Sequence, residues 1–294
     1  MKKLKARMTI PIGNLFKTSS IFLIACYFSC QSQSFAMNRI EVKEDGLIGT
    51  FYYSESSQEQ PPILIFGGSS GGNFFDSYQN YPEDLVKSGY AVLSIAYFDY
   101  DGNSLLPDKL RHIPLEYFKK AMDWLEKQPQ TREGGIAVIG NSRGGEAALL
   151  LATIYPEIST VIAIVPSAYI GGAHNQKRAI TGGAWTLNGE EIPYVDYQKA
   201  VANYTPWWNI IYDLKEVQPY AIPVEEMSAA VLLLSGTKDK VWPSTEMSER
   251  IMKRLTSKNY QFPYEHISYE AGHNIRMTSW PDIRRFLATH FSPQ

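Results

Sequence analysis

A serine between two glycines is the first feature of this sequence that could do chemistry. Residues 140 to 144 are Gly140, Asn141, Ser142, Arg143 and Gly144, which match the pattern G-x-S-x-G. The apolar run IAVI precedes them and an apolar, helix-forming run follows, so the serine lies at a tight turn between a strand and a helix. Such a turn points the hydroxyl outward, and its glycines let strand and helix approach closely. The N–H groups and dipole of the helix N-terminus then favour a developing oxyanion. The pattern predicts Ser142 as a nucleophile.

A serine hydroxyl needs a neighbouring base to act as a nucleophile at neutral pH. Three histidines follow Ser142 in the chain, His266, His273 and His290. His273 comes just after a predicted strand and before a predicted helix, in the kind of loop that commonly carries catalytic groups. His266 falls inside a predicted strand and His290 lies near the C-terminus. We therefore expect His273 to be the base and the other two to be structural or exposed.

An acidic residue should complete this set, in the chain order serine, acid, histidine. The apolar run Val231–Leu234 predicts a buried strand, and Asp239 follows its end. There it would accept a hydrogen bond from Nδ1–H of His273 and stabilise the imidazolium. The alternative is a solvated loop aspartate, because lysines flank it on both sides.

A glycine-rich segment, Gly67 to Gly72, follows another apolar run. It lacks the G-K-[ST] ending of a phosphate-binding loop, and no G-x-G-x-x-G register fits it. Next to a serine nucleophile, a loop at this place supplies a second donor to the oxyanion. We expect backbone N–H groups of Gly68 or Ser69 to act together with that of Arg143. The alternative is a plain flexible turn.

Metal and thiol chemistry have no support in the sequence. Both cysteines, Cys26 and Cys30, lie near the N-terminus, the histidines are scattered, and no H-E-x-x-H motif occurs. We expect no metal, no cofactor and no disulfide in the main part of the chain.

The elements that must position these residues alternate along the chain. Short apolar strands followed by helices predict βαβ units and a mostly parallel central sheet with helices on both faces. We expect a hairpin over Asn38–Tyr53, strands over Pro62–Phe66, Ala91–Tyr97, Gly135–Gly140, Thr160–Val165, Ala229–Leu234 and Tyr264–Tyr269, and helices over Tyr81–Ser88, Ile113–Lys127, Gly144–Tyr155, Ser244–Leu255 and Trp280–His290. Together with the serine turn, this order predicts an α/β-hydrolase fold.

The alternation stops between about residues 166 and 228, a stretch rich in glycine and aromatic residues. An irregular insertion inside an α/β domain is usually a lid or the wall of a pocket. We therefore expect an aromatic-rich, lid-like insertion whose Trp185, Trp207 and Trp208 line an apolar acyl pocket. The alternative is a surface excursion that packs its own aromatic side chains.

The first 36 residues have the pattern of a secretory signal peptide. They contain five basic residues, all before the apolar run Ile21–Phe28, and no acidic residue. The small-x-small tripeptide that ends at Ala36 predicts cleavage after this residue. The apolar run is too short to span a bilayer. We expect a single domain over 37–294 that is periplasmic or secreted. Translation from Met8 and lipid attachment at Cys30 are the alternatives.

The charge balance limits the partners. The chain has 28 Lys and Arg against 30 Asp and Glu, and removal of the basic leader would leave a more acidic body. Such a body argues against nucleic acid or anionic lipid as the main partner. We expect a small-molecule acyl ester or thioester as substrate and no stable membrane span after leader cleavage. The sequence does not predict an oligomeric state.

Four stretches resemble one known family, the catalytic C-terminal domain shared by acyl-CoA thioester hydrolases and bile acid-CoA:amino acid N-acyltransferase. That group belongs to the dienelactone-hydrolase-like α/β-hydrolases, and the resemblance extends from about Ile40 to Phe291. The matching stretches are Phe66–Gly72 (FGGSSGG), Tyr90–Tyr97 (YAVLSIAY), Ile113–Phe118 (IPLEYF) and Gly140–Glu146 (GNSRGGE).

This resemblance implies Ser142 as acyl acceptor, Asp239 as acid and His273 as base. Family members commonly carry a β-sandwich domain before the hydrolase domain, and we expect none here. The N-acyltransferase uses a cysteine nucleophile, so the serine favours hydrolysis over acyl transfer. The resemblance thus predicts an acyl-CoA thioesterase-like enzyme. The alternatives are an exported carboxylesterase or dienelactone-hydrolase-like enzyme on small esters, an acyltransferase, and a non-catalytic binding protein.

Overall fold

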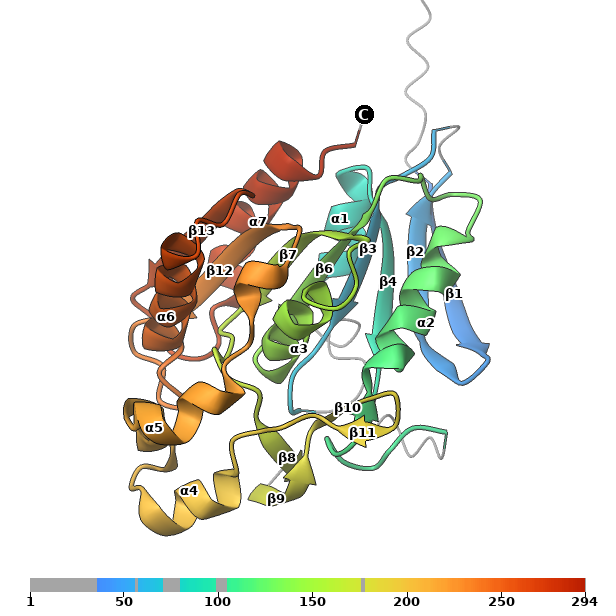
Figure 1. Cartoon of the computed structure of the whole chain (residues 1–294). Helices are drawn as coiled ribbons and strands as arrows, with labels where there is room; N and C mark the ends of the chain where they lie inside the picture. The colour runs from blue at the N-terminus through green and yellow to red at the C-terminus, as the bar shows by residue number, and fades with distance from the viewer. Residues whose placement is uncertain (1–35, 56–57, 71–79, 99–104, 176–177, 294) are drawn as a thin grey trace, which may run out of the picture. The chain divides into compact units, whose positions relative to one another are not determined.

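An eight-stranded sheet forms the centre of the described part of the chain (Figure 1). The structure is a computed structural model that describes residues 36–293 except 56–57, 71–79, 99–104 and 176–177. In spatial order the strands are β1 (Met37–Glu44), β2 (Leu47–Ser54), β4 (Ala91–Ala96), β3 (Pro62–Phe66), β6 (Ile136–Asn141), β7 (Ile158–Ile164), β12 (Ala230–Gly236) and β13 (Tyr264–Tyr269). From β4 to β13 all neighbours are parallel, whereas β1 and β2 pair antiparallel. The predicted mostly parallel sheet is confirmed.

The antiparallel edge begins with the hairpin expected from the sequence. Glu44 pairs with Leu47, so only Asp45 and Gly46 form the connection. Both have positive φ, 51° and 78°, as a two-residue turn between twisted strands requires. The Asp-Gly pair adopts these values at little cost, which fixes the register of β1 on β2.

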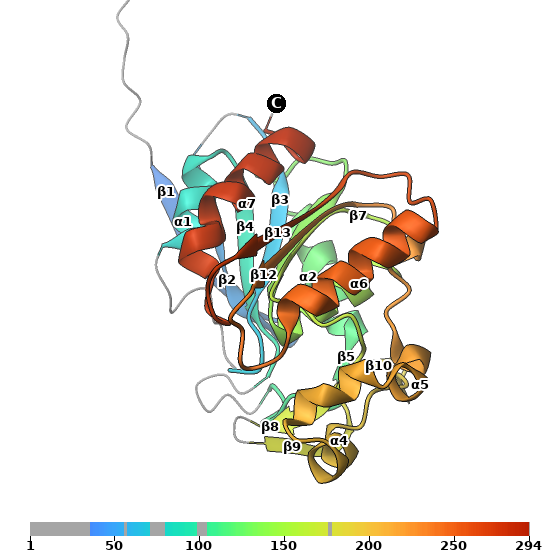
Figure 2. The ribbon, with the colours of Figure 1, turned by 90° about the vertical axis from the view of Figure 1, so that its left-hand side faces the viewer.

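Helices cover both faces of the sheet, as Figure 2 shows. The helices α1 (Tyr81–Lys87) and α7 (Arg276–His290) pack on one face, and α2 (Leu115–Glu126), α3 (Arg143–Ala152) and α6 (Ser244–Ser257) pack on the other. In β3, Ile63 and Ile65 face the α1 and α7 side, while Leu64 and Phe66 face the α2 and α3 side. Because the strands are covered on both faces, their sequences are continuously apolar.

The insertion predicted over residues 166–228 consists of short strands and short helices. Its elements are β8 (Gly172–Asn175), β9 (Arg178–Gly183), β10 (Trp185–Leu187), β11 (Glu190–Glu191), α4 (Tyr197–Asn203), η1 (Trp207–Tyr212), α5 (Leu214–Val217), η2 (Gln218–Tyr220) and η3 (Val224–Glu226). The strand β10 also pairs with β5 (Ile113–Pro114), which forms the start of the segment expected to be helical. The helix α2 begins two residues later than predicted, because Ile113 and Pro114 are extended, with a ψ of 129° at Pro114, and the Ile113 N–H donates to the Ala184 carbonyl across the sheet.

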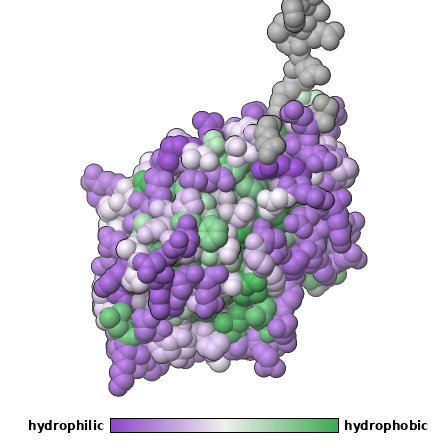
Figure 3. All heavy atoms as spheres, turned by 45° about the horizontal axis from the view of Figure 1, so that its top comes forward, coloured by the Kyte–Doolittle hydropathy of each residue, from purple (hydrophilic) through white to green (hydrophobic). Residues whose placement is uncertain are grey.

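The leader expected over residues 1–36, including Cys30, lies outside the described residues apart from its last position. Figure 3 shows a face that is mostly hydrophilic, with apolar residues in small separate patches. Across the described ranges, no helix has both the length and the apolar character that a bilayer span needs.

Candidate active site

Ser142 lies at the bend between β6 and α3, in a backbone conformation that side chains rarely adopt. Its φ is 57° and its ψ is −117°, and its N–H donates to the Ile164 carbonyl at the end of β7 at 2.7 Å. Such a conformation costs about 1–3 kcal/mol and persists only where the surroundings enforce it. It turns the side chain out of the sheet, as expected for a nucleophile at a strand–helix bend.

Two glycines make that bend possible. A Cβ on Gly140 would lie 2.1 Å from the Gly144 carbonyl oxygen, and a Cβ on Gly144 would lie 2.2 Å from that of Gly67. Neither distance is compatible with a side chain, so both positions require glycine. The bend is therefore packed against the end of β6 on one side and the loop after β3 on the other.

The three residues expected to cooperate meet at this point. His273 Nε2 lies 2.9 Å from Ser142 Oγ, and His273 Nδ1 lies 2.7 Å from Asp239 Oδ2. His273, Ser142 and Asp239 follow β13, β6 and β12 respectively, and the carboxyl ends of these strands share one edge of the parallel sheet. With Nδ1–H donated to the carboxylate, Nε2 remains free to accept the serine hydroxyl proton.

The carboxylate of Asp239 is fixed by its own loop. Its Oδ1 accepts hydrogen bonds from the Val241 N–H at 2.9 Å and the Trp242 N–H at 3.3 Å, and the side chain is fully covered from solvent. The sequence left open a solvated aspartate between two lysines, but only the lysines face the solvent. The His273 side chain keeps 22% of its surface exposed, so the imidazole can still be reached from outside.

Trp242 supports the imidazole from behind. Its ring lies edge-on to His273 with centroids 5.7 Å apart, and its Nε1–H donates to the Val165 carbonyl at 3.0 Å. Trp242 was not among the site residues expected from the sequence. Its only signal was its place three residues after Asp239, in the loop that the acid had to occupy.

The other two late histidines lie apart from Ser142. His266 is in β13 and contacts Ser235 Oγ through Nε2 at 2.8 Å, and burial lowers the pKa of its imidazole. His290 packs on Phe286 at the end of α7 with ring centroids 4.5 Å apart. Both make structural contacts, as expected.

The loop after β3 lies against the bend. A Cβ on Gly68 would come within 2.8 Å of Ser142 Cβ and 3.4 Å of the Arg143 nitrogen. The Tyr97 hydroxyl donates to the Gly67 carbonyl at 2.9 Å and fixes this approach. Arg143 is the first residue of α3, whose first-turn N–H groups have no acceptor within the helix. Ser69 lies in the next turn, while Gly71 and Gly72 lie outside the described residues.

Arg143, the residue after the nucleophile, forms a buried ion pair with Glu146. The side chains of Arg143 and Glu146 are 3% and 0% exposed and are joined through Nη1 and Oε2. Oε1 of Glu146 accepts from the Gly171 N–H at 2.9 Å and from Trp185 Nε1 at 2.8 Å. Burial raises the pKa of Glu146, an effect that the guanidinium opposes.

The guanidinium continues this network into the insertion. Arg143 Nη2 donates to the carbonyls of Gly171 at 2.9 Å and Gly172 at 3.1 Å, and Nη1 donates to the Tyr197 hydroxyl at 3.2 Å. Burial raises the pKa of that hydroxyl to about 12, so it stays a neutral group beside the arginine. Sequence reasoning assigned only the backbone of Arg143. The signal available for more was the Gly-Gly-Glu that follows the serine motif.

The tryptophans proposed as pocket walls occupy different environments. Trp185 is fully buried, bonded to Glu146 and packed against Tyr97 and Phe118. It therefore offers no surface to an open pocket, and its predicted place there is wrong. Trp207 and Trp208 lie half-buried on η1, where Trp207 packs edge-to-face on Tyr197 with centroids 5.0 Å apart.

Among the residues that the structure describes, no three His, Cys, Asp or Glu side chains gather as a metal site would require. The site thus consists of a serine, an imidazole and a carboxylate in hydrogen-bonding sequence beside the N-terminus of a helix. Such a set can activate a hydroxyl for attack on an acyl carbon.

Comparison with known proteins adds a family and a fold. Residues 113–292 match the family model described as "BAAT / Acyl-CoA thioester hydrolase C terminal". Human mitochondrial acyl-coenzyme A thioesterase 2 is 29% identical over 210 residues, which cover 69% of this chain and 41% of the human protein. The chain thus spans less than half the length of this relative.

Solved structures of esterases and related hydrolases share the architecture. An esterase from Pyrococcus furiosus superposes with a TM-score of 0.56 at 16% identity, covering 87% of this chain and 93% of that one. A candidate dienelactone hydrolase from Klebsiella pneumoniae gives a TM-score of 0.57 at 14% identity, covering 87% and 98%. At these identities the likeness shows the fold alone, which is the predicted α/β-hydrolase fold.

Proposed function

Since the chain belongs to the BAAT/acyl-CoA thioester hydrolase C-terminal family, we propose that it is a serine hydrolase that cleaves acyl thioesters or esters through an acyl-serine intermediate. The observation that carries this proposal is the pair of contacts at His273, 2.9 Å to Ser142 Oγ and 2.7 Å to Asp239 Oδ2. A serine hydrolase needs both contacts at once, because the imidazole must accept the serine proton and keep one tautomer.

The first step of the proposed reaction acylates Ser142. Its Oγ attacks the carbonyl carbon while His273 Nε2 takes the hydroxyl proton, and Asp239 stabilises the imidazolium that forms. The carbonyl oxygen becomes an oxyanion, which the backbone N–H of Arg143 and that of Gly68 or Ser69 stabilise. When the tetrahedral intermediate collapses, the alcohol or thiol leaves with the proton from His273.

Water resolves the acyl-enzyme in the second step. His273, now neutral again, takes a proton from a water molecule as its oxygen attacks the acyl carbon. Collapse of the second tetrahedral intermediate returns the proton to Ser142 Oγ and releases the acid. The exposed part of the His273 side chain gives water the access that this step needs. An acyl group on a serine is normally passed to water, which favours hydrolysis over transfer to an amine.

The substrate class is proposed from the family. The human relative is named as an acyl-coenzyme A thioesterase, so an acyl thioester is the first substrate to test. Small carboxylic esters are the second, because the structural neighbours include an esterase.

A fluorophosphonate probe tests the mechanism, because it phosphonylates only an activated serine. We expect labelling of the intact protein and loss of labelling in Ser142→Ala and His273→Ala. Ser69→Ala is the matched control, since it removes a nearby hydroxyl and leaves the proposed backbone donor in place. An unlabelled intact protein, or labelling that survives Ser142→Ala, would contradict the proposal and favour a binding protein.

A substrate panel then separates the two substrate classes. Rates are compared for acyl-CoA thioesters and p-nitrophenyl esters of the same chain lengths. A kcat/KM that is higher for the thioesters supports a thioesterase, and the reverse order supports a carboxylesterase. Hydroxylamine or glycine added as acceptor detects acyl transfer, which we expect to be minor relative to hydrolysis.

A further inference from the structure

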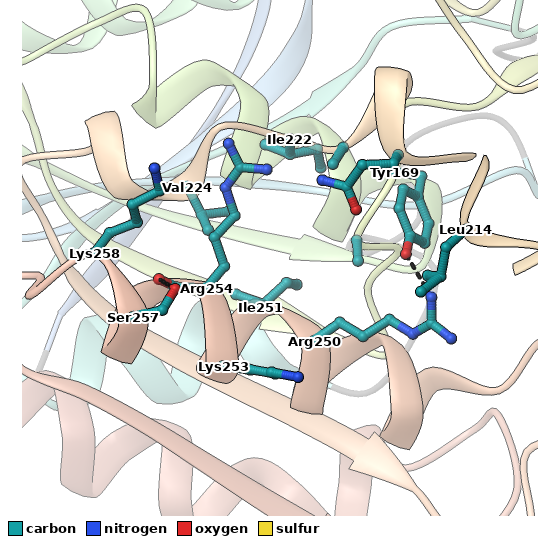
Figure 4. A pocket seen from close by; sticks show the side chains of 13 residues that line it. Tyr169, Leu214, Ile222, Val224, Arg250, Ile251, Lys253, Arg254, Ser257 and Lys258 are labelled. Atoms are coloured by element: carbon teal, nitrogen blue, oxygen red, sulfur yellow. Dashed lines mark hydrogen bonds between the residues drawn. The ribbon is translucent and has the colours of Figure 1, made fainter. Parts of the chain in front are cut away.

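A cavity lies between α6 and the last part of the insertion, and Figure 4 shows its lining side chains. Its volume is about 560 Å³, within the range of about 300–1,000 Å³ that small-molecule sites occupy. Leu214 and Ala221 of the insertion give it accessible apolar surface, and the buried Ile222, Val224 and Ile251 also border it. None of the catalytic candidates lines it, so it is distinct from the site at Ser142.

Four cationic side chains border this cavity, Arg250, Lys253 and Arg254 of α6 and Lys258, the residue that follows the helix. Arg250, Arg254 and Lys258 recur at intervals of four residues, which places them along one side of the helix, and Lys253 is the neighbour of Arg254. No acidic residue is among the lining residues. These side chains give the cavity a positive rim, although the net charge of the chain is −2.

The two arginines are already held in place. Arg250 Nη1 donates to the Tyr169 hydroxyl at 2.6 Å and to the Ile211 carbonyl at 2.7 Å. Arg254 forms a two-pronged ion pair with Glu225, including an Nη2–Oε1 contact of 2.7 Å. These contacts hold the two guanidinium groups at the cavity, and Glu225 neutralises the charge of one of them.

The two lysines, in contrast, are not held by other side chains of the described residues. Lys253 and Lys258 are exposed, and within the described residues neither ammonium group has a hydrogen bond or an ion pair. Glu246 and Glu249 lie beside Lys253 in an adjoining hollow, and the Tyr212 hydroxyl already donates to Glu246. The cations available to a ligand at this rim are thus Lys253, Lys258 and the anchored Arg250.

We propose that this cavity binds an amphiphilic anion, a small molecule with an apolar chain and a carboxylate or phosphate head. The chain would lie against Leu214 and Ala221, where it removes apolar surface from water. The head would be bound by Lys253 and Lys258 at the rim. A neutral ligand leaves the positive rim uncompensated, and an inorganic anion leaves the apolar walls uncovered, so neither fits as well.

Calorimetric titration tests the proposal in the protein carrying Ser142→Ala, which prevents turnover and makes binding independent of catalysis. The probes are decanoate, decyl phosphate, decanol and inorganic phosphate. We expect at least one of the two anionic amphiphiles to bind at a one-to-one ratio, and decanol and inorganic phosphate to bind at least about tenfold more weakly. The ratio of the decanoate and decyl phosphate affinities identifies the head group.

Substitutions at the rim assign the binding to this cavity. We expect Lys253→Glu with Lys258→Glu to weaken the better amphiphile at least about tenfold, and Lys253→Arg with Lys258→Arg to keep it within about threefold. The control is Lys87→Glu with Lys127→Glu, which makes the same charge change on exposed lysines outside the cavity and should leave affinity unchanged. Binding that ignores the Lys253 and Lys258 reversal, or equal binding of decanol, would overturn the proposal.

Discussion

The buried pair behind the nucleophile gives a quantitative prediction. Glu146→Ala removes a carboxylate that is completely covered and leaves the Arg143 guanidinium, which is 3% exposed, without its counter-ion. It also leaves the Gly171 N–H and Trp185 Nε1–H without the acceptor that they now reach at 2.9 and 2.8 Å. Each loss occurs where water cannot easily substitute for the missing oxygen.

The expected cost follows from that burial. Removing one partner of a buried ion pair destabilises a protein by about 3–5 kcal/mol. The guanidinium keeps the Gly171 and Gly172 carbonyls as acceptors at 2.9 and 3.1 Å, which favours the lower part of that range. We expect the free energy of unfolding to fall by about 3–4 kcal/mol, and the melting temperature by roughly 6–16 °C for a domain of this size.

Urea denaturation and calorimetry measure this loss, and two further variants identify its source. Glu146→Gln keeps an oxygen acceptor but removes the charge, so it should cost less than Glu146→Ala. Arg143→Met with Glu146→Leu removes both charges together, so its stability should recover most of the loss. An unchanged m-value would show that the denatured state is not the cause.

Activity of the same variants separates support of the nucleophile from stability. The double variant lacks every side-chain bond from the start of α3 to the 171–172 segment, so we expect its kcat to stay low although its stability recovers. A loss below about 1 kcal/mol for Glu146→Ala would contradict the burial of this pair, because it would mean that water reaches the two charges. Full kcat in the stable double variant would limit the pair to a structural role.

Three further predictions concern Gly68 and Asp239 of the site and the structural histidine His266. Gly68→Ala places a Cβ 2.8 Å from Ser142 Cβ and should lower kcat about 100-fold with ester substrates, whereas Gly272→Ala, whose nearest neighbour would be at 3.7 Å, should be tolerated. Near-normal turnover in Gly68→Ala would contradict the contact. Asp239→Asn should lower kcat by a factor of about 10²–10⁴ through the wrong imidazole tautomer, and a pre-steady-state burst assay shows whether acylation is the slowed step. Burial lowers the pKa of His266 from its ordinary 6.5, so its contribution to stability is present above that value and is lost as the pH falls through the lowered pKa. His266→Gln should flatten the acid side of a stability–pH curve measured by urea denaturation, and an unchanged slope would assign it to other groups.

The sequence predicted the features that depend on local patterns. Each buried strand of a parallel sheet appears as a continuous apolar run, and such runs located β3, β4, β6, β7 and β12. Because chemistry in such sheets gathers at the carboxyl ends of strands, the positions of Asp239 after one of these runs and of His273 after the strand expected over Tyr264–Tyr269 were informative. The Asp-Gly turn and the glycine pattern around Ser142 carried equally local signals.

The features that the sequence did not predict depend on long-range packing. Trp185 lies in an aromatic segment, but no periodicity in that segment indicates that the indole turns inward to Glu146, 39 residues earlier in the chain. The short β5–β10 pairing likewise joins segments distant in sequence through only two residue pairs, Trp185 with Ile113 and Thr186 with Pro114. Pairings this short leave no pattern that distinguishes them from loop.

The buried charges at Arg143 and Glu146 are not explained by stability alone, since apolar side chains of similar size often serve a core as well or better. Ser142, however, holds a strained φ of 57° and needs neighbours that resist its relaxation. The Ile164 carbonyl and the glycines at 67 and 68 hold the bend from two sides. A third contact comes from the Arg143 guanidinium, which donates hydrogen bonds to two carbonyls of the insertion. Its planar group has the fixed geometry needed to hold both carbonyls at once. The insertion therefore helps to position the nucleophile, because the Gly171 and Gly172 carbonyls accept the hydrogen bonds that hold Arg143, the residue after Ser142.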